Sequence, residues 1–290
     1  MSKKNYKKKK ILKPEEFVNL WKNLPEFLKQ RRLKNAYSVI RPIIKKQLFL
    51  LNEYKESDNK KKSSGHLYFF NTVKNFYDNV KLAFLMGKRK SMKNFTLYPA
   101  RMCMESLMRF MYFCKQDKQK RDEIAEKELF KIYARLYKRE KSEGIIKQDY
   151  IKAYNEMVDM SGLNVPNIDD VNEDKEFNSF PNMYDLCHLS GRKDPKNDYF
   201  LYKCLCEDVH GKLIAIVIRS QSEKYQNFTR ATILLLNFCN EMVILVDKTF
   251  LDSQQRKSVE PCIKKVNETI MGPASFLERI FFKKNNRKGR

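Results

Sequence analysis

Three side chains that could carry out chemistry lie in two apolar stretches of the chain. Arg101 and Glu105 stand four residues apart in LYPARMCMESLMRFMYFC, and His210 lies near the end of YFLYKCLCEDVHG. His210 is one of only three histidines, whose side chains titrate close to neutral pH. Metal-independent RNA cleavage needs a proton acceptor for the 2′-hydroxyl and a cation for the charged phosphorane. His210 could supply the base or acid, Arg101 could bind the phosphate, and Glu105 could orient either one.

The same residues also have a purely structural interpretation, which we favour. Charged groups in an apolar helix are usually paired. Arg101, Glu105 and Arg109 follow one another at four-residue intervals, so Arg101 and Glu105 can pair on one helix face. His210 could donate a buried hydrogen bond to Glu105 and hold two helices together. Catalysis by Arg101, Glu105 and His210 is kept as the alternative.

The sequence favours neither a metal nor a cofactor. Seven cysteines, an odd number, lie mostly in apolar stretches, which is typical of buried, reduced thiols. A zinc site built from Cys187, His188, Cys204 and Cys206 would have a spacing that matches no common zinc motif. Signatures of nucleotide-binding loops, zinc proteases and serine hydrolases are absent from the sequence.

The charge of the chain argues for an anionic partner. Its 59 Lys and Arg residues against 35 Asp and Glu residues make a formal charge of +24. Nucleic acid is the first candidate, and an acidic protein is another. An acidic membrane surface is disfavoured because the apolar residues of the N-terminal helices are needed for packing. A lysine-rich surface without a partner is the simplest alternative. Clustered basic residues could neutralise phosphates without reading bases, which predicts salt-dependent binding. The candidate residues are Lys7, Lys8, Lys9, Lys10, Arg31, Arg32, Lys45, Lys46, Lys88, Arg89, Lys90, Lys283 and Lys284.

Apolar residues recur at three-to-four spacing through most of the chain, and no long β-alternation occurs, which predicts an all-α, multi-helix bundle. We expect four regions: a basic disordered tail (1–10), an N-terminal helical extension (11–56), a main helical bundle (66–250) and a basic C-terminal segment (251–290). Helices are predicted over 14–24, 25–37, 42–54, 66–86, 97–114, 115–142, 145–160, 182–189, 199–219 and 229–250. Residues 161–181 are expected to be a loop or an ordered insert whose acidic run DDVNEDKE folds back on the basic surface.

No membrane-spanning helix is expected. The basic N-terminus is not followed by the long apolar core of a signal peptide. Two windows, 213–219 and 231–246, are the most apolar. The second contains Asn237, Asn240 and Glu241, so it favours a buried helix over a membrane span. A cytoplasmic location is the expectation.

Three segments in order, ARMCMESLMRFMYF, MYDLCHLSG and YKCLCEDVHG, resemble a family of bacterial helical proteins of unknown function. That family pairs an "aR…lE" helix with a downstream "Y..lS..vHg" helix. The resemblance covers roughly residues 67–246, and Cys206 stands where the family more often has serine. The positions that it implies are Arg101, Glu105, Tyr202, His210 and Gly211.

More remotely, such bundles resemble the HEPN superfamily of RNA-cleaving and nucleotide-binding domains. This resemblance implies an RNA-related role in bacterial stress or anti-phage defence. The arginine that precedes the HEPN histidine by a few residues is missing, because the nearest arginine upstream of His210 is Arg192.

The sequence therefore leads to one favoured function and two alternatives. The favoured function is RNA or DNA binding without sequence specificity. The alternatives are a metal-independent, HEPN-like ribonuclease or toxin, and a structural or regulatory subunit that binds an acidic protein partner.

Overall fold

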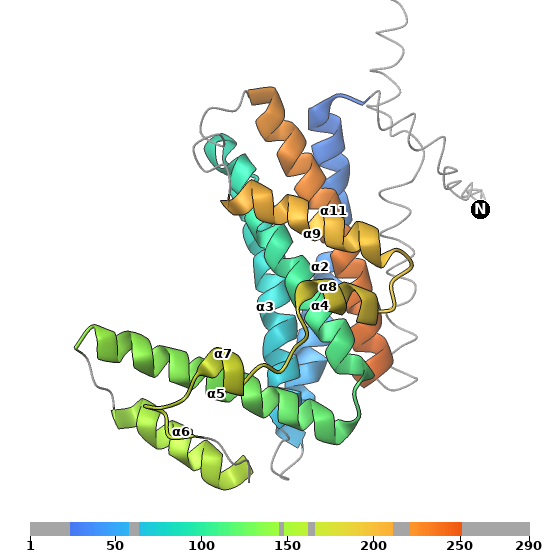
Figure 1. The fold of residues 1–290 in the computed structure, drawn as a ribbon. Coiled ribbons are helices and arrows are strands. Elements are labelled where there is room, and N and C mark those ends of the chain that lie inside the picture. Colours follow the sequence, from blue (N-terminus) through green and yellow to red (C-terminus); the bar gives the residue numbers. More distant parts are fainter. Residues whose placement is uncertain (1–23, 58–63, 145–147, 162–165, 211–220, 251–290) are drawn as a thin grey trace, which may run out of the picture. The chain divides into compact units, whose positions relative to one another are not determined.

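The computed structural model describes residues 24–57, 64–144, 148–161, 166–210 and 221–250 (Figure 1). Within these residues the protein is helical and contains no strand, which confirms the predicted all-α, multi-helix fold. The elements are α2 (Glu26–Ser57), α3 (Ser64–Met86), the 3₁₀ helix η1 (Lys90–Thr96), α4 (Leu97–Lys115), α5 (Lys118–Ser142), α6 (Gln148–Ser161), α7 (Glu173–Glu176), α8 (Met183–Leu189), α9 (Pro195–His210) and α11 (Gln221–Phe250).

The described residues form two compact units that do not follow the order of the chain. Unit 1 contains residues 24–50, 77–103, 205–210 and 221–250, and unit 2 contains 51–57, 64–76 and the described part of 104–204. The division runs through α2, α3, α4 and α9. The sequence prediction places the boundary at the polar stretch between 11–56 and 66–250. Each of the two units instead contains parts of both predicted regions.

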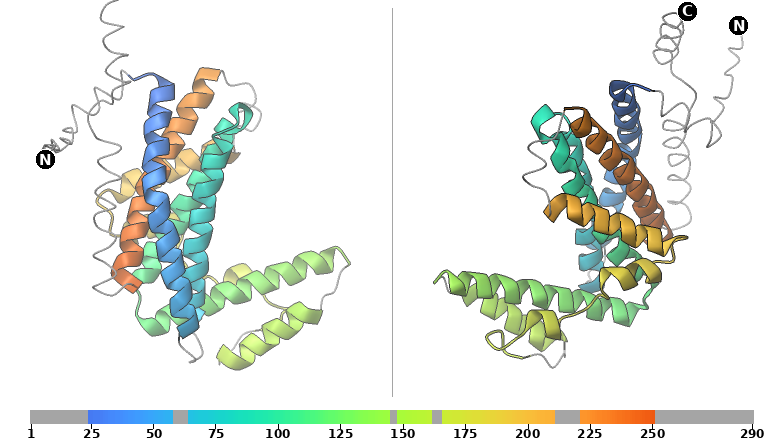
Figure 2. Two further views of the ribbon diagram at one scale, coloured as in Figure 1. Left: turned by 180° about the vertical axis from the view of Figure 1, so that it is seen from behind. Right: turned by 45° about the horizontal axis from the view of Figure 1, so that its top comes forward.

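Unit 1 is built on α2, which runs beside the second half of α3 and α11 (Figure 2). Tyr37 of α2 stacks on Phe84 of α3 with ring centroids 3.9 Å apart. Gly87, which follows α3, lies so close to Phe228 of α11 that an added Cβ would stand 1.9 Å from its ring. A side chain at position 87 would therefore push the two elements apart.

The sequence prediction of two separate helices over 25–37 and 42–54 is wrong. The structure has one continuous helix with Pro42 inside it. A proline in a helix interior costs about 3 kcal/mol through a lost hydrogen bond and a steric clash. Ile40, Ile43 and Ile44 are at most 7% exposed, and burial of such side chains stabilises by about 1.5–3 kcal/mol each. Because Pro42 itself is exposed and its neighbours pack, burial outweighs the local penalty.

Gln47 is a buried polar residue that links three helices of unit 1. It is fully buried, accepts a hydrogen bond from the hydroxyl of Tyr77 and donates one to the carbonyl of Val243, both at 2.9 Å. One amide side chain thus joins α2, α3 and α11 inside the core. Burial also raises the pKa of Tyr77 well above its usual value, so this hydroxyl stays protonated and remains a donor.

Replacing Gln47 by leucine is expected to lower the free energy of unfolding by about 1–3 kcal/mol, because the buried Tyr77 hydroxyl loses this acceptor. Urea unfolding followed by circular dichroism would measure the change. The double variant Gln47→Leu/Tyr77→Phe should cost less than the sum of the two single variants, since the two groups are in contact. Strictly additive costs would show that the hydrogen bond between them contributes nothing.

Unit 2 contains a core cluster between α5, α6 and the segment 166–177, and Figure 2 shows α6 and α7 alongside α5. Phe130 of α5 lies 5.3 Å from Tyr154 and 5.5 Å from Phe177, measured between ring centroids. The start of α5 is capped by Asp117, whose side chain accepts a hydrogen bond from the amide of Lys120 at 2.8 Å. The buried members of the cluster are Phe130, Ala134, Tyr137, Tyr154, Ile168, Val171 and Phe177.

The described part of the predicted insert, residues 166–181, is ordered. Asp169, from its acidic run, forms an ion pair with Lys141 at 2.5 Å and accepts a hydrogen bond from the Tyr137 hydroxyl at 2.7 Å. These two donors lower the pKa of the Asp169 carboxyl. The acidic segment thus folds back on the basic helix α5, as the charge pattern predicts.

Most other helix predictions agree with the structure to within a few residues. Predicted segments 66–86, 97–114, 115–142, 145–160 and 182–189 correspond to α3, α4, α5, α6 and α8. α11 begins eight residues earlier than predicted and ends at the predicted position. The predicted helix 199–219 starts earlier, at Pro195, and its part beyond His210 lies outside the described residues. The predicted helix 14–24, except its last residue, and both basic end segments also lie outside them.

The part of the chain that the structure describes has no clear membrane span. One stretch, Phe228–Val246 of α11, is long and apolar enough to cross a membrane, and 56% of its most apolar window is buried inside the protein. A core helix has the same composition, so this stretch is weak evidence for a span.

Candidate functional site

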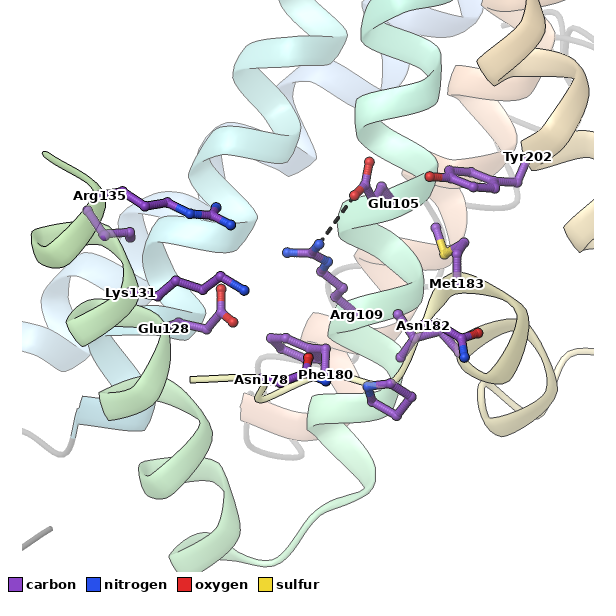
Figure 3. A pocket seen from close by; sticks show the side chains of 13 residues that line it. Glu105, Arg109, Glu128, Lys131, Arg135, Asn178, Phe180, Asn182, Met183 and Tyr202 are labelled. Carbon is purple, nitrogen blue, oxygen red and sulfur yellow. Dashed lines mark hydrogen bonds and ion pairs between the residues drawn. The ribbon is translucent and has the colours of Figure 1, made fainter. Parts of the chain in front are cut away.

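A pocket of about 350 Å³ lies in unit 2, between α4, α5 and the chain that leads into α8 and α9 (Figure 3). Its lining is largely charged and polar, with a few apolar side chains. We call it the cationic pocket. The lining residues are Glu105, Arg109, Glu128, Lys131, Ile132, Arg135, Asn178, Phe180, Pro181, Asn182, Met183, Leu186 and Tyr202.

α4 contributes the best-defined pair of charges. Arg109 Nη2 lies 3.3 Å from Glu105 Oε1, at the four-residue spacing that places two helical side chains side by side. The guanidinium carbon of Arg109 also lies 5.5 Å from the centroid of the Phe180 ring, a cation–π distance. A carboxylate and an aromatic ring thus hold the Arg109 side chain at the pocket, with 40% of it exposed.

α5 contributes three further charged groups. Glu128, Lys131 and Arg135 recur at three- and four-residue spacing, so they lie on one face of the helix. Glu128 accepts a hydrogen bond from the hydroxyl of Ser179. In Figure 3, Lys131 and Arg135 extend from α5 toward the space that Arg109 enters from α4. Together the lining has three cations and two carboxylates.

Phe180 is held by a cluster of aromatic rings behind the pocket. It is 7% exposed and lies 6.1 Å from Tyr68 and 6.0 Å from Tyr112, between ring centroids. Tyr68 packs in turn against Phe113 at 5.5 Å. Burial, with a smaller contribution from the negative charge of Glu128, raises the pKa of Tyr68, so this phenol stays neutral. The aromatic wall of the pocket is therefore closely packed and carries no charge of its own.

The structure places the proposed catalytic residues as follows. Glu105 lines the cationic pocket and pairs with Arg109. Arg101 is partly buried on α4, one turn earlier, in the stretch that belongs to unit 1. His210 is the last residue of α9, and its side chain lies outside the described residues, as does Gly211. The convergence of Arg101, Glu105 and His210 stays a prediction.

Sequence reasoning missed most of the pocket. Of the positions that the family resemblance implies, Glu105 and Tyr202 line it. Arg109 is visible in the sequence only as part of the charged stripe on α4. Lys131 and Arg135 belong to a highly charged segment whose pattern indicates an exposed surface helix, and their spacing alone was the signal that they share a face.

The predicted phosphate-contacting residues divide into three groups. Arg31, Lys45 and Lys46 are exposed on α2, and Lys88 and Arg89 are exposed after α3, all in unit 1. Arg32 is 6% exposed, which leaves little of its side chain for a phosphate. The backbone of Lys90 begins η1, and its side chain lies outside the described residues, as do Lys7, Lys8, Lys9, Lys10, Lys283 and Lys284 in full.

The described cysteines are free thiols, and Cys103, Cys187 and Cys239 are buried. Burial, together with the nearby charge of Asp198, raises the pKa of Cys187 to about 11, so its thiol is largely protonated at neutral pH. Cys114, Cys204 and Cys206 are partly exposed, so burial is confirmed for three of the six described cysteines, and their reduced state stays a prediction. Among the residues with described side chains, no group of three or more His, Cys, Asp or Glu could hold a metal ion.

Comparisons with protein-family models, with curated proteins and with solved structures found no match for this chain. The chemistry of the site is therefore argued from its side chains. Arginine presents a planar fork of donors that suits phosphate oxygens, lysine adds a mobile positive charge, and an aromatic ring offers a stacking surface. The cationic pocket combines arginine, lysine and aromatic rings in one lining, and its cations suit a phosphate group.

Proposed function

We propose that this protein binds RNA or DNA without reading its sequence, and that the cationic pocket holds backbone phosphate. The observation that carries the proposal is the convergence of Arg109, Lys131 and Arg135 from two helices onto one pocket of a chain with a formal charge of +24. The two carboxylates, Glu105 and Glu128, already accept hydrogen bonds from Arg109 and from Ser179. With three cations and two carboxylates, the lining keeps a positive formal charge.

Exposed basic residues of unit 1 support the same function. The side chains of Arg31, Lys45 and Lys46 on α2, and of Lys88 and Arg89, are open to solvent. Contacts of this kind neutralise phosphates and release counterions without distinguishing bases. These phosphate contacts would increase the affinity for nucleic acid beyond the contribution of the cationic pocket.

Binding rather than cleavage is the function we propose for the pocket. Its lining, drawn from the described residues, includes Arg, Lys and Glu but no histidine that could serve as general base. An arginine held by a carboxylate and a ring is well suited to hold a phosphate, and a buried tyrosine kept neutral behind it adds no charge.

A salt series tests the proposal. Fluorescence anisotropy would follow labelled oligonucleotides of two unrelated sequences, each as RNA and as DNA, between 50 and 200 mM KCl. With five phosphate contacts on a single strand, affinity should fall about 100-fold over this range. The two sequences should bind equally. Polyglutamate of matched charge serves as the control for an acidic protein partner. Absence of binding, salt-independent binding, or stronger binding of polyglutamate would contradict the proposal.

A further inference from the structure

Four aromatic side chains form a continuous row across α8 and α9 in unit 2. Ring centroids of Tyr202 and Tyr199 lie 6.5 Å apart, those of Tyr199 and Tyr184 5.1 Å apart, and those of Tyr184 and His188 4.4 Å apart. We call these residues the aromatic row. Tyr202, which Figure 3 shows at the edge of the cationic pocket, also lines that pocket, so the row begins there.

The aromatic row faces solvent, unlike the aromatic core of the same unit. Tyr184 is 48% exposed and His188 is exposed, while Tyr199 and Tyr202 are half-buried. Phe130, Phe110 and Phe177 of unit 2, by comparison, are at most 1% exposed. Tyr184 packs edge-to-face with Tyr199 at an interplanar angle of 87°, and nearly half of Tyr184 stays exposed, so part of its ring surface is open to a ligand.

The turn between α8 and α9 is held in place by several polar contacts. Arg192 Nε donates to Asp198 Oδ2 at 2.8 Å, and Asp198 is 7% exposed. Lys115 Nζ donates to the carbonyl of Leu189 at 2.7 Å, which ties the end of α8 to α4. Gly191 adopts a φ of +76° that other residues rarely take. The row is thus ordered before any ligand arrives, which lowers the entropic cost of binding.

Positive charge accompanies the row. Lys196 and Lys203 are exposed on α9, three residues before and four residues after Tyr199, so they lie on the same side of the helix. At the other end, Tyr202 lines the same pocket as Lys131 and Arg135 and lies on the side of Glu105 in Figure 3. Cations beside a row of surface rings match a ligand that alternates phosphates with flat bases.

We infer that the cationic pocket and the aromatic row together bind single-stranded nucleic acid. Bases stack on Tyr184, Tyr199 and Tyr202, and the cations of the pocket hold the backbone phosphates. The inference rests on the proposed function and adds the strandedness of the ligand. Bases in a duplex are already stacked on one another, so only an unpaired strand can offer them to a row of rings.

Substitution of Tyr184 tests the inference by anisotropy with labelled twelve-nucleotide oligo-U, oligo-dT and a duplex of equal length, at one salt concentration. The unaltered protein should bind the single strands at least tenfold more tightly than the duplex. Tyr184→Leu should weaken single-strand binding about fivefold or more, since one stacked base is lost. Its duplex affinity and its salt slope should stay unchanged, because no charge is removed. The ratio of oligo-U to oligo-dT affinity distinguishes RNA from DNA as the preferred ligand.

Two control variants show whether a loss of binding in Tyr184→Leu comes from the missing ring at this position. Tyr184→Phe keeps the ring and should retain the affinity of the unaltered protein. Tyr98→Leu removes a ring that is 49% exposed in unit 1 and should leave single-strand binding unchanged. Thermal melting would show that all three variants fold.

Each failure has a distinct meaning. Equal binding of duplex and single strands, with no effect of Tyr184→Leu, would overturn the single-strand inference and leave the proposed function standing. Absence of binding to every oligonucleotide would overturn both. An equal loss in Tyr184→Leu and Tyr184→Phe would overturn base stacking at this ring.

Discussion

Charge reversal of Lys131 and Arg135 together is expected to weaken nucleic-acid binding on the order of a hundredfold at low salt, if the proposed function is correct. Both side chains line the cationic pocket from one face of α5. At about 4 Å in water, a cation near a phosphate gains about 1 kcal/mol, and a glutamate there loses a similar amount. Two reversals therefore change the interaction by about 4 kcal/mol before salt screening reduces it. Anisotropy with oligo-dT measures the loss.

The salt dependence of the same variant provides a second readout. Loss of two phosphate contacts on a single strand should make the slope of log K against log salt less steep by about 1.4. The matched control reverses two exposed lysines of unit 2 outside the pocket lining, Lys118→Glu/Lys152→Glu, with the same change in net charge. Equal losses in both double variants would show that overall charge, and not the pocket, determines binding.

Replacement of Phe130 by alanine is expected to lower the free energy of unfolding by about 3–5 kcal/mol. Phe130 is fully buried and packs between Tyr154 and Phe177, so its removal leaves a cavity shared by α5, α6 and the insert. Such packed interiors relax only in part around a cavity, which adds to the lost burial. Urea unfolding followed by circular dichroism would measure the change.

Phe200→Ala is the matched control for the loss of Phe130. Phe200 belongs to the same unit and is 64% exposed, so its removal should cost less than about 1 kcal/mol. Phe130 also stands two residues from Glu128 and one from Lys131, so a shift of α5 would move part of the pocket lining. An unfolding midpoint of Phe130→Ala equal to that of Phe200→Ala would contradict the assignment of the unit 2 core.

The local pattern of the sequence predicts the helices well, because helix formation depends on neighbours three and four residues apart. Apolar spacing correctly indicates α3, α4 and α5. It fails at Pro42, where local chemistry predicts a break and the burial of nearby isoleucines keeps α2 continuous. The energy that decides this case comes from other parts of unit 1, which local rules do not include.

The prediction for the insert, residues 161–181, is confirmed in part. Its acidic composition predicts attraction to a basic surface, and Asp169 does pair with Lys141. Composition alone leaves open whether the segment is a loop or ordered. Burial of Ile168, Val171 and Phe177 in the core of unit 2 decided that it is ordered.

The candidate site depends much more on tertiary structure. Glu105 is notable in the sequence because a carboxylate in an apolar helix needs a partner. Lys131 and Arg135, in contrast, have the pattern of any solvated lysine-rich helix, and Tyr184 and Tyr199 that of ordinary helical aromatics. Only the packing of unit 2 brings α4, α5, α8 and α9 together around one pocket and one row of rings.

The sequence by itself determined that this protein is all-helical and strongly basic, since both properties follow from composition and short-range spacing. The tertiary structure decided which of its charged and aromatic residues meet. Convergence of Arg109, Lys131 and Tyr202 joins positions up to 93 residues apart, and contacts of that separation are set by the packing of whole helices. The spacing of residues in the sequence shows which face of a helix a side chain lies on. Which other helix contacts that face is decided by tertiary packing.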